Sequence, residues 1–290
     1  MSSPRLITSV AELREISRAA KFAGQTVGLI PTMGALHAGH VSLVAAAAQS
    51  CQCVIVSIFV NPTQFAPHED LQKYPRDLAA DLQLLAPHHV AAVFAPTVEQ
   101  MYPANFQTAV TVQELSQPWE GVVRPTHFSG VATVVLKLFL AAEPDYAYFG
   151  QKDYQQLAVI RQMTADLALP VQIVGCPIIR DADGLALSSR NQYLTAEQRE
   201  QGLALSRALG VAAEMVQRGE RDGAELSSAL HDILASADLT VDYAVIVDAT
   251  TLAPLARLDR PAVALVAARV GSTRLIDNRL LDPMPAPRVV

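Results

Sequence analysis

The chain has 290 residues, of which 51% are hydrophobic and 17% charged, and its formal net charge is −6 at pH 7. This length can bury a full core in one large or two ordinary domains. No apolar run is long enough to span a bilayer, the chain start lacks a basic-then-apolar signal pattern, and no cluster of Lys and Arg suits a phosphate backbone. We therefore expect a cytoplasmic protein that binds neither a membrane nor nucleic acid.

The cysteines are Cys51, Cys53 and Cys176. An odd and sparse set argues against a disulfide framework, and Cys51 with Cys53 lacks the second pair that a zinc site needs. We expect all three to be small buried residues.

The first part of the chain predicts a helix, a strand and a second helix. Ser9 can cap a helix that runs through Lys21. The apolar run 27–30 is typical of a buried strand, and the alanine- and leucine-rich segment 41–49 favours a helix.

The turn between that strand and that helix carries His37, Gly39 and His40. Residues three apart on a helix lie side by side, and a helix start points unpaired N–H groups at its ligand, so the turn can receive a phosphate. Two imidazoles can donate hydrogen bonds to a pentavalent phosphate without forming a covalent bond. A polar side chain that only satisfies the helix start is the alternative, and it suits one histidine better than two. The His-x-Gly-His pattern resembles that of the nucleotidyl-transferring superfamily, whose members attack the α-phosphate of ATP.

A continuous β-branched run over 53–60 predicts a second buried parallel strand, followed by Gln64 and Phe65. Ligands of open α/β sheets bind beyond the carboxyl ends of the strands. We therefore expect Gln64 and Phe65 to face the same crevice as His37 and His40.

Further along, we expect a helix over 77–86, a strand over 91–95, an edge strand over 108–112 and an apolar helix that opens at 124–131 and ends near Ala142.

A strand over 145–149 leads into a glycine turn and a polar helix start. In that turn Lys152 can meet a phosphate, and Asp153 can hold a ribose hydroxyl or a magnesium-bound water. An ordinary capped surface helix is the alternative for this segment.

After a strand over 171–176, the loop 187–191 offers two hydroxyls and a guanidinium, a plausible clamp for triphosphate oxygens. The same composition is common in loops, and only its position after the βα series gives it weight.

From Thr195 the pattern changes to two helices, 196–218 and 224–235, and then to strands over 241–247, 262–268 and 273–276. The fold class that we predict is α/β: a Rossmann-like, doubly wound parallel sheet over 1–185, and a smaller α+β C-terminal domain over 186–290. The proline-rich end, 282–290, is expected to be loose.

Four segments, in order and at family-like spacing, resemble the pantothenate synthetase (pantoate-beta-alanine ligase) family: 31–40, 59–65, 149–156 and 183–191. The resemblance extends to Leu275-Ile276-Asp277-Asn278. It implies a two-step ligation in which pantoate attacks Mg-ATP to give pantoyl adenylate and pyrophosphate. β-Alanine then releases AMP and pantothenate, the precursor of coenzyme A. A homodimer through the larger domain is also implied.

The resemblance assigns roles to residues of this chain. The catalytic residues that it implies are His37, His40, Lys152, Ser188, Ser189 and Arg190. The residues that it places at ATP are Pro31, Thr32, Met33, Gly34, Ala35, Leu36, His37, Ala38, Gly39, His40, Gly150, Gln151, Lys152, Asp153, Ile179, Leu187, Ser188, Ser189 and Arg190. Gln64 and Gln156 are implied to bind pantoate, with Gln64 also at the β-alanine position.

Physical reasoning agrees with these roles. Pantoate carries a gem-dimethyl group and two hydroxyls, so its pocket needs apolar walls, which Phe65, Val134 and Val135 can supply. An acyl adenylate hydrolyses readily, so we expect the smaller domain to act as a lid that excludes water. Asp81 is the candidate for approaching the magnesium ion, and an ordinary solvated helix Asp is the alternative. Gln151 stands where many family members have Glu, which alters only the local charge.

Two alternatives stay open. Another small adenylyltransferase of the superfamily, acting on a phosphate acceptor, would need more cationic residues than Gln64, Phe65 and Gln156 provide. A nucleotide-binding module without catalysis would bind ATP and fail to turn it over, although intact His37 and His40 argue against such decay. No G-x-G-x-x-G follows a strand and no P-loop occurs, which excludes a nicotinamide dehydrogenase and a P-loop enzyme.

Overall fold

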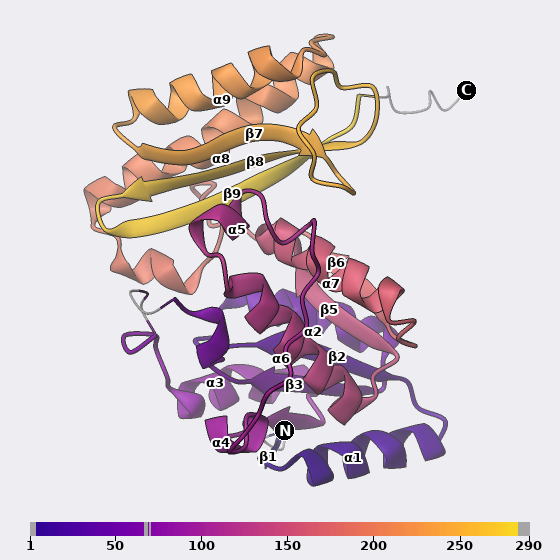
Figure 1. The fold of residues 1–290 in the computed structure, drawn as a ribbon. Helices are drawn as coiled ribbons and strands as arrows, with labels where there is room; N and C mark the ends of the chain where they lie inside the picture. The colour runs from indigo at the N-terminus through magenta and orange to yellow at the C-terminus, as the bar shows by residue number, and fades with distance from the viewer. Residues whose placement is uncertain (1–3, 67–68, 70, 284–290) are drawn as a thin grey trace. The chain divides into compact units, whose positions relative to one another are not determined.

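The computed structural model describes residues 4–66, 69 and 71–283 of the chain (Figure 1). It contains two compact units: residues up to Gln151 together with Gln155–Pro177, and Lys152–Tyr154 together with the chain from Ile178 onward. After Pro177 the chain stays in the second unit, which therefore resumes at Ile178, somewhat before the boundary that the sequence predicts at residue 186. The short Lys152–Tyr154 segment belongs to the second unit although the first unit surrounds it in sequence.

The first unit is built on a six-stranded sheet in the order β1-β4-β3-β2-β5-β6, and every pairing in it is parallel. Its strands are β1 (Arg5–Ile7), β2 (Val27–Thr32), β3 (Cys53–Ile58), β4 (Ala92–Phe94), β5 (Tyr146–Gly150) and β6 (Gln172–Cys176). The strand order reverses direction between β2 and β5, which makes this the topological switch point of a doubly wound sheet. The predicted Rossmann-like class is confirmed.

Five consecutive residues of β3 are buried, and alternate side chains of a strand point to opposite faces, so both faces of this sheet are covered. The helices are α1 (Val10–Phe22), α2 (Ala38–Ser50), α3 (Leu78–Leu85), α4 (Val98–Met101), α5 (Glu120–Val123), α6 (His127–Ala142) and α7 (Tyr154–Asp166). Short 3-10 turns lie at η1 (Pro62–Gln64), η2 (Ala86–His88) and η3 (Gln151–Asp153). All three cysteines are buried and free, as predicted.

The edge strand predicted over 108–112 is wrong. The backbone there is not extended along the sheet, because its polar groups bind side chains of α6 instead. Val110 N–H donates to Thr133 Oγ1 at 2.9 Å, and its carbonyl accepts from Ser129 Oγ at 3.1 Å. The edge strands are β6 and the short β1, which pairs with β4. Sequence reading missed β1 because three residues are too few for a periodic pattern.

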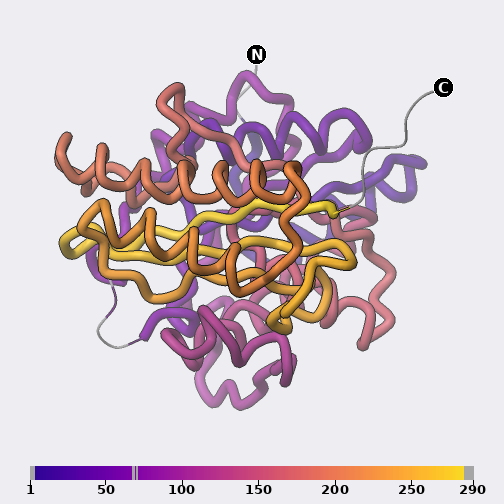
Figure 2. Tube along the Cα trace, turned by 90° about the horizontal axis from the view of Figure 1, so that it is seen from above, coloured from indigo at the N-terminus to yellow at the C-terminus, as the bar shows by residue number. Residues whose placement is uncertain are grey.

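The second unit is a three-stranded antiparallel sheet, in the order β7-β8-β9, packed on two helices. Its elements are η4 (Ser189–Tyr193), α8 (Ala196–Gln217), α9 (Gly223–Ser236), β7 (Thr240–Asp248), β8 (Ala262–Val270) and β9 (Thr273–Leu281). Alanines of β8 and leucines of both helices share one apolar core. Figure 2 shows both helices lying along the strands. The predicted α+β organisation is confirmed, and β9 runs on to Leu281, further than predicted.

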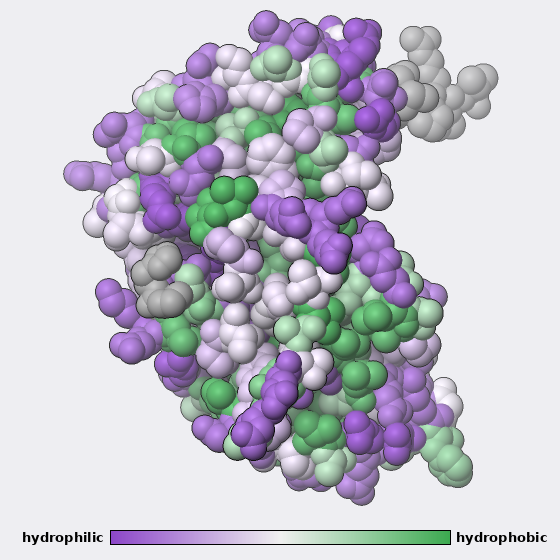
Figure 3. Space-filling view, viewed as in Figure 1, coloured by the Kyte–Doolittle hydropathy of each residue, from purple (hydrophilic) through white to green (hydrophobic). Residues whose placement is uncertain are grey.

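Helices α1 and α8 both begin with a capping box, the first of them at the predicted cap Ser9. Ser9 and Glu12 form a capping box at the start of α1, and Thr195 and Gln198 form another at the start of α8. Polar and apolar side chains are intermixed on the face that Figure 3 shows. Within the described part of the chain, no helix is both long and apolar enough to cross a bilayer. Most of the end predicted to be loose, 284–290, lies outside the described residues.

Candidate active site

The histidine turn joins β2 to α2 at the carboxyl edge of the parallel sheet. His37 is the N-cap of α2, and its Nδ1 accepts from Gly39 N–H at 3.1 Å. His40 Nδ1 accepts from His37 N–H at 3.3 Å, which completes a capping box made of two imidazoles. The ring centroids lie 4.1 Å apart, so the two side chains are neighbours as predicted.

This capping fixes the tautomer of both rings. A ring nitrogen that accepts a backbone N–H carries no proton, so each neutral imidazole has its proton on Nε2. His37 and His40 therefore each carry an Nε2–H beside the N-terminus of α2. The Nδ1 atoms of both histidines thus satisfy the helix start.

The preceding turn is held by Asp81, which projects from α3. Its carboxylate accepts from Leu36 N–H at 2.7 Å and from Ala35 N–H at 3.2 Å. Gly34 and Ala35 both have positive φ, +82° and +50°. A Cβ on Gly34 would lie 2.9 Å from Asp81 Oδ2 and 3.1 Å from Ile58 Cγ2, so glycine is required for conformation and for space.

Asp81 is buried, with 4% of its surface exposed. Burial raises the pKa of this carboxyl above its usual value, and the two backbone N–H donors only partly oppose the rise. Both oxygens are already engaged by the turn. Among the described residues, no group of three or more His, Cys, Asp or Glu side chains could hold a metal ion. Each Asp81 oxygen thus holds one backbone N–H of the turn.

Gln64 reaches the histidine turn from η1, at the end of β3. Its Nε2 contacts Met33 Sδ at 2.9 Å, and its Oε1 accepts from Asn61 Nδ2 at 3.1 Å. Tyr102 OH in turn donates to Asn61 Oδ1 at 2.8 Å. The structure therefore brings Gln64 beside the turn that begins α2, and a chain of hydrogen bonds sets the orientation of its amide.

Asn61 and Tyr102 received no role from the sequence. Asn61 is 1% exposed and also donates to Gly130 O at 3.1 Å, which ties η1 to α6. A signal for Asn61 was present, because a polar residue directly after a buried strand lies at the ligand-binding edge. No pattern in the sequence pointed to Tyr102, which arrives from the end of α4.

The backbone of Gln64 is held separately from its side chain. Its carbonyl lies 3.0 Å from His127 Nδ1 and accepts from Arg124 Nη2 at 3.2 Å. Arg124 makes a bidentate pair with Glu69 at 2.7 and 2.8 Å. Burial raises the pKa of the Glu69 carboxyl, but the hydrogen bonds and charge of Arg124 outweigh it and leave that pKa below its usual value.

The remaining predicted substrate residues of the first unit lie on α6, α7 and the segment after η1. Phe65 is buried and meets Tyr74 edge-on, with ring centroids 6.0 Å apart. Val134 and Val135 are buried in α6. Gln156 in α7 is partly exposed.

The adjacent residue, Gln155, has a different task from Gln156. It is buried, donates to Leu115 O and Pro118 O, and accepts from Glu120 N–H. Gln155 therefore fastens the 115–120 loop to α7. The two glutamines are indistinguishable by sequence, and only burial separates them.

Of the other predicted ATP residues, Gly150 and Gln151 belong to the first unit, and the rest belong to the second. Leu187 N–H donates to Ile179 O at 2.9 Å, which sets these two residues side by side. Ser188 caps η4 by accepting from Arg190 N–H at 3.3 Å. The carbonyl of Lys152 accepts from Asn278 Nδ2 at 2.8 Å.

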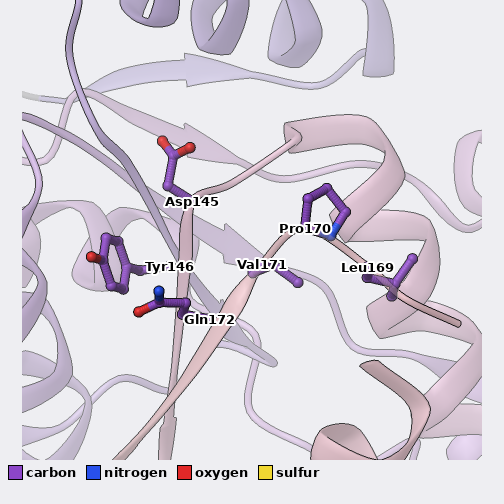
Figure 4. Close-up of a pocket in the computed structure, with 6 residues that line it drawn as sticks. All are labelled: Asp145, Tyr146, Leu169, Pro170, Val171 and Gln172. Carbon is purple, nitrogen blue, oxygen red and sulfur yellow. The ribbon is translucent and has the colours of Figure 1, made fainter. Parts of the chain in front are cut away.

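A hollow of about 420 Å³ lies elsewhere, at the amino ends of β5 and β6 (Figure 4). It is lined by Asp145, Tyr146, Leu169, Pro170, Val171 and Gln172. Ligands of parallel sheets bind at the opposite, carboxyl ends of the strands. This hollow is therefore separate from the candidate site.

Comparison with known proteins supplies what the geometry leaves open. A family model described as pantoate-beta-alanine ligase matches residues 5–280. The chain belongs to this family. It is 50% identical to a pantothenate synthetase of Moorella thermoacetica over 278 residues, 96% of this chain and 98% of the relative. It is 52% identical to that of Rhodopirellula baltica over 277 residues, 94% of this chain and 98% of the relative. The protein is thus an enzyme of the ligase class.

Solved structures agree in fold as well as in sequence. The pantothenate synthetase of Thermus thermophilus has a TM-score of 0.90 and 47% identity, over 97% of this chain and 100% of that one. The pantoate-beta-alanine ligase of Francisella tularensis, solved with beta-gamma ATP and beta-alanine, has a TM-score of 0.78 and 33% identity over the same shares. These likenesses extend to both units of the chain.

Proposed function

We propose that this enzyme joins (R)-pantoate to β-alanine at the cost of ATP cleavage to AMP and pyrophosphate. The intermediate is pantoyl adenylate, and the product, pantothenate, feeds the synthesis of coenzyme A. The family supports this reaction, as does the Francisella tularensis relative solved with beta-gamma ATP and beta-alanine. The structural observation that carries it is the pair of capping histidines, His37 and His40, fixed as Nε2–H donors.

In the first step a pantoate carboxylate oxygen attacks the α-phosphorus, and the bond to the pyrophosphate oxygen breaks. The Nε2–H groups of His37 and His40 donate to the phosphoryl oxygens, where negative charge grows. Lys152 and Arg190 neutralise the departing pyrophosphate, and the hydroxyls of Ser188 and Ser189 donate hydrogen bonds to it.

In the second step the amine of β-alanine attacks the acyl carbon, the bond to the AMP oxygen breaks, and the nitrogen loses a proton. Gln64 and Gln156 hold the polar groups of pantoate, and Phe65, Val134 and Val135 form the wall against its methyl groups. Gln64 suits this task because Asn61 holds its side-chain amide and Arg124 holds its backbone carbonyl.

Magnesium enters this scheme with ATP, as the counter-ion of the triphosphate. Asp81 holds the turn at Ala35 and Leu36, since its oxygens accept their N–H groups. Residues 31–40, 150–153 and 187–190, with the backbone of residue 179, bind the nucleotide in this scheme.

The acyl adenylate must be shielded from water between the two steps, and we assign that task to the C-terminal domain acting as a lid. Pantoate-dependent AMP formation without β-alanine tests the shielding, since a shielded adenylate forms once and hydrolyses slowly.

The enzyme in this proposal works in the cytoplasm as a homodimer. Cross-linking and light scattering test the dimer.

The first experiment measures pyrophosphate released from ATP, with pantoate alone and then with β-alanine added. We expect one equivalent per site with pantoate alone and multiple turnovers once β-alanine is present. His40→Ala removes a donor that acts on the transition state, so it should lower the rate by about 100-fold or more. If folded wild-type protein releases no pyrophosphate in response to pantoate, another adenylyl transfer or simple nucleotide binding takes the place of this reaction.

A further inference from the structure

Two adjacent polar residues, Asp277 and Asn278, interrupt the otherwise largely apolar inner part of β9. Each has only 4% of its surface exposed. A buried polar group is costly unless it is hydrogen-bonded, so such a pair in a core strand has a specific set of partners. Neither residue has a part in the chemistry proposed above.

Asn278 binds the segment that carries Lys152. Its Nδ2 donates to the Lys152 carbonyl at 2.8 Å. Tyr154, two residues further on, donates from its hydroxyl to Ala249 O at 2.8 Å. These bonds account for the membership of 152–154 in the second unit, although the first unit surrounds it in sequence.

Asp277 binds the segment that leads to Arg190. Its two oxygens accept from both terminal nitrogens of Arg180, at 2.6 and 2.9 Å, and its side chain is only 3% exposed. Arg180 also donates to Gly184 O at 3.1 Å and pairs as an isolated bridge with Ala186. Arg180 thereby braces the hairpin that holds Ile179 beside Leu187.

The two side chains point to opposite faces of the sheet, because successive residues of a strand alternate. Asn278 N–H also donates to Asp277 Oδ1 at 2.8 Å, so the two residues restrain each other. Two adjacent residues of β9 therefore bind two separate segments of the chain. One segment carries Lys152 and the other leads to Arg190, the two cations assigned to the triphosphate.

We propose that Asp277 and Asn278 are positioning residues that set the spacing between Lys152 and the 187–190 loop, and so tune the site for a nucleoside triphosphate. This rests on the proposed function only in assigning Lys152 and Arg190 to the phosphates of ATP. The pair touches no reacting atom and acts through the backbone that it holds.

The test is a double-mutant cycle on equilibrium ATP binding to the full-length protein. Asn278→Asp keeps the shape of the side chain but cannot donate to the Lys152 carbonyl, and Asn278→Ala is the second variant. The control is Arg279→Ala, which alters the exposed neighbour on the same strand. Thermal melting selects variants that are folded at the assay temperature.

We expect Asn278→Asp to weaken ATP binding about tenfold and to leave KM for pantoate within twofold. In a Lys152→Ala background the same change should add less than twofold, because its effect passes through Lys152. Arg279→Ala should bind ATP like the wild type.

The proposal would be overturned if Asn278→Asp weakened ATP binding equally in the wild-type and Lys152→Ala backgrounds. Unchanged ATP affinity in folded Asn278→Asp and Asn278→Ala proteins would also overturn it. The proposed function is judged separately, by pantoate-dependent pyrophosphate release from the wild type. If the wild type lacks that reaction while the ATP-binding measurements give the expected result, the ligase chemistry is rejected and the positioning role is kept.

Discussion

His37 and His40 satisfy the start of α2, and we propose that the same residues act in the chemistry. Each gives its Nδ1 to a backbone N–H at the start of α2, and this fixes where its proton lies. Asp81 likewise accepts backbone N–H groups, those of Ala35 and Leu36 in the strained turn before α2. Side chains that accept backbone N–H groups thus set the geometry of the turn before α2.

Asp81→Asn separates the turn-holding role from metal binding. The amide keeps one acceptor and loses the other, so one of the two backbone N–H groups at Ala35 and Leu36 loses its partner. We expect kcat/KM for ATP to fall about tenfold, while the magnesium concentration for half-maximal rate stays within twofold. Steady-state assays over a magnesium series check this. A large rise in the magnesium requirement would instead make Asp81 a ligand.

The Glu69–Arg124 pair predicts a pH dependence of stability. The pKa of Glu69 in the folded protein lies below its usual 4.5, so the fold binds its proton less tightly than the unfolded chain does. Its contribution is therefore complete above pH 4.5 and is lost as the pH falls through the folded value. We expect the free energy of unfolding of the wild type to exceed that of Glu69→Gln by about 1 kcal/mol at pH 7.

Melting curves of the two proteins from pH 7 to pH 3 measure this difference. The gap should narrow only in the acid part of the range. A gap that is constant with pH would assign the loss to packing and not to the ion pair.

At the scale of elements, the site depends on how closely α6 approaches η1. Gly130 makes this approach possible, since a Cβ there would lie 2.5 Å from Thr63 O and 2.7 Å from Gln64 N. Helix period, strand runs and capping residues predicted most elements of both units. The exceptions were short segments whose conformation depends on distant partners, such as β1 and residues 108–112.

Gly130→Ala should therefore destabilise the protein by about 2 kcal/mol and raise KM for pantoate, because α6 must move away from Gln64. The matched control is Gly210→Ala in α8, where the new Cβ meets nothing within 4 Å. That control should stabilise the protein by about 0.5–1 kcal/mol. Chemical denaturation measures both changes. Equal effects of the two substitutions would contradict the close packing of α6 on η1.

At the scale of the whole molecule, the chain consists of two units, each with its own core and its own buried polar connections. The Arg180–Asp277 pair lies entirely within the second unit. Removing one partner of a buried ion pair leaves the other charge uncompensated, which costs about 3–5 kcal/mol.

Arg180→Ala should accordingly lower hydrogen-exchange protection in α8, α9 and β7–β9, and leave β2–β6 protected as in the wild type. Exchange read by mass spectrometry over peptides of both units checks this. Uniform loss of protection over the chain would mean that the two units unfold as one. Asp277→Asn with Arg180→Met removes both charges and should recover part of the loss.

The sequence by itself determined the fold class, most elements, the buried cysteines and the family, because periodicity, capping and ordered motifs are local signals. It also indicated that Gln64 would meet the histidine turn, since both follow parallel strands. Only the tertiary structure showed the engagement of Asp81, the fixing of Gln64 by Asn61, Arg124 and His127, and the grip of Asp277 and Asn278 on two segments. Each of these depends on partners far apart in the chain, and hydrogen-bond geometry between such partners exists only once the core has placed them.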